Sequence, residues 1–182
     1  MPRIPPITGK ADLPAEHHGV VDDVLKTFGA VRGPFTVMLH SPALVEQMLA
    51  FIGFYRDRSV VEAKDRSIAI LVCARERQGA YVWSAQVNAA RRAGLREEVI
   101  EVIRGRKDPA GLRAEEREIL AYADQLIRTN RVDQASFDAL LKRHGAKWLV
   151  ELTVAANYFG IVCGLVNAFE VPAPADGDKL PA

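Results

Sequence analysis

The chain has few of the residues from which redox and metal centres are built. Its two cysteines, Cys73 and Cys163, lie far apart in the sequence and within apolar segments. Metal knuckles and redox dithiols place their cysteines a few residues apart, and this spacing gives neither. Because free cysteines are among the most buried residue types, we expect two buried structural thiols.

Histidine is also scarce. The four histidines occur without a His-x-x-x-His pair or a carboxylate pattern to match them, which excludes the usual zinc motifs. No glycine-rich phosphate loop follows a strand-like segment. The sequence therefore predicts no metal and no cofactor.

The chain also has no excess of positive or negative charge. The chain has 24 Lys and Arg against 23 Asp and Glu, a net charge of +1, and no long block of like charge. This balance argues against a nucleic-acid partner. Residues 1–6 contain no apolar run of signal-peptide length, and we therefore expect a cytoplasmic protein.

The pattern that is present is helical. Hydrophobic residues make up 49% of the chain and charged residues 26%, as in globular proteins, and 182 residues suit one domain. Apolar positions recur at helical spacing, with no alternating run of strand length. Helices are expected over residues 15–28, from Pro42 past Tyr55, and over 61–77, 81–93, 96–103, 114–128, 134–144 and 147–169. A loop is expected at 33–35. The prediction is an all-α single domain over 15–170, with a core unit at 61–104, an N-terminal arm at 1–14 and a C-terminal tail at 171–182.

The last expected helix carries no charge from Leu152 to Phe169. A stretch of this length is the minimal signal of a membrane span. Polar residues interrupt it, however, and Gly160 and Gly164 suit close packing against another helix. We therefore expect a buried helix, partly in a subunit interface, and no membrane association.

Three short segments, at residues 64–71, 81–86 and 89–95, carry a recognisable pattern. They resemble the core repeat of the carboxymuconolactone decarboxylase / alkylhydroperoxidase D-like family. Residues 39–44 and 151–158 resemble the longer, single-chain branch of this family. The resemblance covers most of the chain and implies an alkylhydroperoxidase D-like helical bundle that assembles as a homo-oligomer, either a dimer, a trimer or a hexamer.

The residues behind the chemistry of that family are replaced here. Its redox branch carries a glutamate, a Cys-x-x-Cys pair and a histidine, and its decarboxylase-like branch carries Glu-Trp-x-x-His. With Gly94 fixing the register, the glutamate position is Ser67, the cysteine positions are Gly79 and Val82, and the histidine position is Gln86. The resemblance thus implies that the Cys-x-x-Cys peroxidase mechanism is lost, because its two thiols are absent.

Several side chains are candidates for a remaining site. An amide such as Gln86 cannot transfer a proton but can orient a substrate, and it can equally be a polar residue packed between helices. His40 is either a base near neutral pH or a partner of a backbone group. The candidate catalytic residues are Gln86, Ser67 and His40. The candidate substrate-binding residues, which can equally be core packing, are Tyr81, Val82, Trp83 and Tyr158.

The resemblance, taken with these replaced residues, implies three possible functions. The first is a non-redox lyase or decarboxylase-type enzyme, or a binder, acting on a small cyclic or carbonyl compound in an apolar pocket. The second is a non-catalytic oligomeric member of the family. An alkylhydroperoxidase-type peroxidase is the least favoured, because it would depend on Cys73 among apolar neighbours.

Overall fold

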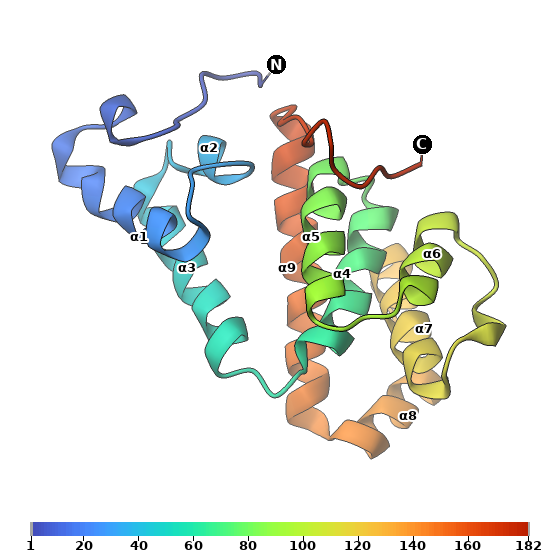
Figure 1. The fold of residues 1–182 in the computed structure, drawn as a ribbon. Coiled ribbons are helices and arrows are strands. Elements are labelled where there is room, and N and C mark those ends of the chain that lie inside the picture. Colours follow the sequence, from blue (N-terminus) through green and yellow to red (C-terminus); the bar gives the residue numbers. More distant parts are fainter. Residues whose placement is uncertain (1, 182) are drawn as a thin grey trace. The chain divides into compact units, whose positions relative to one another are not determined.

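The computed structural model describes residues 2–181, and all regular elements in this range are helical, which confirms the all-α prediction. The chain forms two compact units (Figure 1). The first contains residues 2–58 and Leu165–Pro172, and the second contains Ser59–Gly164 and residues 173–181. The single domain predicted over residues 15–170 stays a prediction.

The first unit has three α-helices, α1 (His18–Phe28), α2 (Phe35–Met38) and α3 (Pro42–Asp57). As predicted, α3 begins at Pro42, where a missing N–H costs no hydrogen bond. Ser41 precedes it and makes no capping hydrogen bond with its side chain. The predicted loop at 33–35 is wrong at its end, because α2 begins at Phe35.

The core of the first unit includes the N-terminal segment. Ile7 is buried with residues of α1, α2 and α3, and its backbone N–H donates to the carbonyl oxygen of Thr36 at 2.8 Å. Arg3 forms an ion pair with Glu170 at 2.8 Å. Residues 3–7 of the predicted arm are therefore bound within this unit.

The second unit is built around α4 (Ala63–Glu76), which contacts α5 (Ala80–Arg92), α6 (Glu97–Gly105) and α7 (Ala114–Thr129) (Figure 1). Every residue from Ile68 to Arg75 is buried, as expected of a helix that is enclosed on all sides. α8 (Gln134–His144) follows, and Asp133 caps it by accepting a hydrogen bond from the N–H of Ser136 at 2.7 Å.

The last helix, α9 (Ala146–Ala168), belongs to the second unit as far as Gly164. It is long and apolar enough to cross a membrane, and 50% of its most apolar stretch is buried. Two polar contacts fix it in this unit. The carboxylate of Glu151 accepts hydrogen bonds from the hydroxyl of Ser59 and the N–H of Val60, both at 2.8 Å, and Tyr122 on α7 bonds Thr153 at 2.7 Å.

The tail of the second unit lies on α5 and α6. Asp178 accepts hydrogen bonds from Arg91 at 2.5 Å and from Arg104 at 2.7 Å. The neighbouring Gly177 lies directly against Ser84, because an added Cβ would be 1.9 Å from the Ser84 hydroxyl oxygen. The described part of the tail is thus held by charge and by close contact.

Asp178→Asn should loosen this tail, because it removes the charge that both arginines bind. We expect a loss of about 1 kcal/mol, since Arg91 is partly exposed and solvent screens the pair. That loss corresponds to trypsin cleavage after Lys179 that is about fivefold faster. Gly177→Ala should have a similar effect, and Asp176→Asn on the exposed side of the tail should have none. Equal cleavage rates in all four proteins would contradict this assignment.

The same contact predicts a pH dependence. The hydrogen bonds from Arg91 and then Arg104 hold the pKa of Asp178 below its ordinary value. A carboxyl group with a lowered pKa stabilises the fold fully above its unfolded pKa of about 3.9, and this contribution disappears as the pH falls through the folded pKa. Hydrogen exchange of the tail should therefore differ between the wild type and Asp178→Asn at pH 5, and the difference should shrink steadily below about pH 4.

Candidate functional site

The predicted site residues of α4 and α5 lie on two helices that pack together. Ser67 is half-buried, and its hydroxyl donates to the carbonyl oxygen of Ala63 in its own helix at 2.7 Å. Gln86 is half-buried and one turn beyond Val82, which is buried. The structure thus brings the segments together, while the Ser67 hydroxyl is engaged within its own helix.

His40 belongs to the first unit. It is exposed, and its Nε2 lies 2.9 Å from the carbonyl oxygen of Pro5, to which it donates. A ring nitrogen that donates in this way fixes one tautomer and leaves Nδ1 as the acceptor. A role for His40 as a base stays a prediction.

The aromatic side chains among the candidate substrate-binding residues are mostly buried. Trp83 is fully buried, and the guanidinium carbon of Arg104 lies 5.4 Å from the centre of its ring. Tyr158 is buried on α9, and desolvation raises the pKa of its hydroxyl to about 12. Tyr81 is half-buried. A neutral hydroxyl and a buried indole are suited to packing and hydrogen bonding, so proton transfer near neutral pH needs other groups.

The space that a side chain at Gly79 would need is occupied by the sulfur atom of Cys163 on α9. A Cβ on Gly79 would lie 2.5 Å from Sγ and 3.2 Å from Cβ of Cys163 on α9. Gly79 has φ −81°, so glycine is needed here for space and not for its backbone angle. Both cysteines are fully buried, and their thiols are hydrogen-bonded to each other. The sequence predicted the burial and missed the contact.

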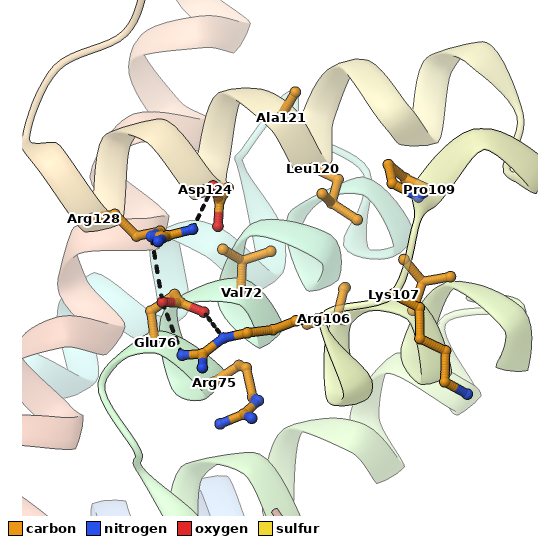
Figure 2. Close-up of a pocket in the computed structure, with 12 residues that line it drawn as sticks. Val72, Arg75, Glu76, Arg106, Lys107, Pro109, Leu120, Ala121, Asp124 and Arg128 are labelled. Carbon is orange, nitrogen blue, oxygen red and sulfur yellow. Dashed lines mark hydrogen bonds and ion pairs between the residues drawn. The ribbon is translucent and has the colours of Figure 1, made fainter. Parts of the chain in front are cut away.

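A separate cavity of about 340 Å³ lies among α4, α6 and α7 (Figure 2). Its walls combine aliphatic side chains with charged ones, and none of the seven predicted site residues lines it. The charged side chains are Arg75, Glu76, Arg106, Lys107, Asp124 and Arg128, and the aliphatic wall includes Val72, Val102, Ile103 and Leu120. Basic side chains thus outnumber acidic ones around an apolar wall.

Glu76 is the centre of a group of ion pairs in the wall of this cavity. Its carboxylate accepts hydrogen bonds from Nε of Arg106 at 2.8 Å and from Nη2 at 3.1 Å, and Arg128 lies at 3.8 Å from it (Figure 2). Arg128 also lies 3.5 Å from Asp124, one turn earlier on α7. These pairs hold Arg106 and Arg128 in place and partly neutralise both.

Arg75 differs from the other cations of the cavity. It is 6% exposed, and its Nε donates to the carbonyl oxygen of Arg104 at 2.9 Å. Its Nη1 is buried and has no hydrogen-bond partner among the described residues. A buried donor without an acceptor costs free energy, and a charged one costs more. Arg75 is therefore a lining residue of the cavity, and its Nη1 is a buried donor without an acceptor among the described residues.

Comparisons with known proteins identify the fold of the chain. No protein-family model and no curated protein matches the sequence. The chain is similar to the crystal structure of an alkylhydroperoxidase AhpD core, an uncharacterized peroxidase-related protein from Ralstonia eutropha JMP134. The two share 17% identity and a TM-score of 0.74 over 94% of each chain. The chain has the alkylhydroperoxidase D fold. At this level of identity the likeness concerns the fold and leaves the chemistry open.

In this alkylhydroperoxidase D fold, Gly79→Ala should be destabilising because the new methyl group meets the Cys163 sulfur. We expect a loss of about 1–3 kcal/mol in the free energy of unfolding, measured with urea. Cys163→Ala should recover part of that loss in the double variant, because the opposing sulfur is then absent. The control is Gly111→Ala, whose added Cβ would have no neighbour within 4 Å. An additive double variant would contradict the proposed contact.

Proposed function

We propose that this chain is a carboxymuconolactone decarboxylase-like protein that binds a small carboxylate-bearing compound in the cavity among α4, α6 and α7. The observation that carries the proposal is Arg75, whose buried Nη1 has no acceptor among the described residues. A carboxylate oxygen would supply that acceptor, and charge-assisted hydrogen bonds of this kind are about twice as strong as neutral ones.

The composition of the cavity supports the same class of ligand. Four basic side chains face two carboxylates, so an anion is favoured over a cation. Val72 and Leu120 form part of an aliphatic wall, against which a ring or short chain can pack. A volume of about 340 Å³ suits a compound of small-metabolite size.

The proposed reaction class is a non-redox lyase step, such as decarboxylation. Such a step needs a group that accepts or donates a proton, and neither Gln86 nor Val82 can do so. Glu76 and Asp124 are the carboxylates that line the cavity. Glu76 is only 12% exposed and is oriented by Arg106, so it is the better-positioned of the two for proton transfer.

Arg75→Gln should weaken carboxylate binding by about 10- to 100-fold, because one charge-assisted hydrogen bond to the ligand is lost. The assay is titration calorimetry with a panel of small cyclic and aliphatic carboxylates, each paired with its neutral amide. Arg131→Gln, an exposed arginine outside the cavity, is the matched control. Thermal denaturation with and without ligand shows whether each variant is folded.

Three results would count against this function. Amides that bind as tightly as their carboxylates would remove the role of the cationic wall. Binding that survives Arg75→Gln and is lost in Gln86→Ala would move the site to α5. If neither carboxylate binding nor turnover is found, and Gln86→Ala, Ser67→Ala and His40→Ala change only stability, the non-catalytic oligomeric protein is the better account.

We also propose that the protein is a homo-oligomer that buries one face of α9. Val150, Val154 and Ile161 lie at helical spacing and are 61%, 43% and 62% exposed. Large apolar residues gathered on one helix face favour association with a second copy. The family resemblance supports the same assembly.

Ile161→Lys should shift the mass in solution toward the monomer, because a charge then lies in the apolar face of α9. Light scattering after size-exclusion chromatography measures this mass. Leu25→Lys is the control, since Leu25 is 40% exposed but lies on α1, in the first unit. A wild-type protein that is monomeric at all concentrations would contradict the proposed assembly.

A further inference from the structure

Two thiols from distant parts of the sequence meet inside the second unit. Cys73 on α4 and Cys163 on α9 are both fully buried. Their thiols interact with each other through a hydrogen bond. Neither residue lines the cavity among α4, α6 and α7, so the pair is separate from the proposed ligand site.

Gly79 makes room for the Cys163 sulfur, and Gly160, one turn before Cys163 on α9, lies close to the Cys73 sulfur. An added Cβ on Gly79 would lie 2.5 Å from the Cys163 sulfur, and one on Gly160 would lie 3.8 Å from the Cys73 sulfur. The Cys163 sulfur therefore occupies the space that a side chain at position 79 would fill.

The two thiols differ in their ionisation. The hydrogen bond from Cys163 lowers the pKa of Cys73, and the positive charge of Arg77 lowers it further against the opposing effect of burial. The same hydrogen bond and burial raise the pKa of Cys163. The thiolate is the reactive form of cysteine, so Cys73 is the nucleophile of the pair and Cys163 is its proton donor.

We propose that Cys73 and Cys163 form a dithiol that hydrogen peroxide oxidises to an intramolecular disulfide. The Cys73 thiolate attacks one peroxide oxygen, the O–O bond breaks, and water leaves after protonation of the other oxygen. The Cys73 sulfenic acid is then attacked by the Cys163 sulfur. The S–S bond forms, the S–O bond breaks and a second water leaves. Two thiols lose two electrons and two protons in total, and one peroxide is reduced to two waters.

Burial selects the oxidant. Neither thiol is exposed, so the oxidant must pass through a transient opening of the helices. Hydrogen peroxide is small and uncharged, whereas oxidised glutathione is bulky and charged. We therefore expect peroxide to close the disulfide at least tenfold faster than oxidised glutathione at equal concentration.

Intact-mass spectrometry of the full chain tests this pair. After reduction and removal of the reductant, peroxide should lower the mass by about 2 Da, which is the mass of the two hydrogens lost. The oxidised protein should then take up no alkylating agent when unfolded, and dithiothreitol should restore both sites of alkylation. A peptide map without reductant should contain the Cys73–Cys163 link. Two thiols that stay alkylatable, or a link only between chains, would overturn the proposal.

Variants test the order of attack. Cys163→Ser should accumulate a sulfenic acid at Cys73 that dimedone traps, and Cys73→Ser should react at least tenfold more slowly at Cys163. Equal rates in the two variants would overturn the assignment of Cys73 as the nucleophile. Gly79→Ala should slow closure of the disulfide by displacing the Cys163 sulfur, and Gly111→Ala should not. Circular dichroism checks the fold of each variant, and the wild-type mass change decides the pairing even if a variant fails to fold.

Discussion

The enclosure of α4 by other helices is the constraint on which the rest of the second unit depends. Every residue from Ile68 to Arg75 is buried, so each side chain of this stretch must find a partner inside the protein. The apolar side chains do so by packing. Cys73 meets the thiol of Cys163, and Arg75 uses one nitrogen to bond the carbonyl oxygen of Arg104. Nη1 of Arg75 has no acceptor among residues 2–181, and this is where we propose that a ligand binds.

The same enclosure separates two kinds of chemistry on one helix. Val72, Arg75 and Glu76 line a cavity with α6 and α7, whereas Cys73 is directed to α9. Binding of an anion and oxidation of the thiols can therefore be measured independently. The two proposed sites use polar groups and thiols at positions that the family resemblance does not mark, which fits the general rule that a fold does not fix a function.

Much of the fold was predictable from the sequence, because helix ends are local features. Pro42 is the first residue of α3, and Asp133 caps α8. The unbroken apolar run from Ile68 to Ala74 indicates the enclosed helix α4. The short helix α2 was missed because four residues give too little periodicity to detect.

The candidate site was much less predictable. The cavity combines side chains from three helices, and in the sequence Arg106, Lys107 and Arg128 have the pattern of solvated charges. One signal was available, since Arg75 continues an apolar run without a break. The contact of Cys73 with Cys163 depends on the packing of distant segments, and spacing along the chain carries no information about it.

We propose above all that Nη1 of Arg75, which has no acceptor within residues 2–181, binds a ligand carboxylate. A high-resolution crystal structure of the protein soaked with a small aromatic carboxylate tests it most directly. The account predicts a carboxylate oxygen about 2.8 Å from Nη1 of Arg75, with the ring of the compound against Val72 and Leu120. A cavity that holds only ordered water on Nη1, with the carboxylate bound elsewhere or not at all, would contradict it.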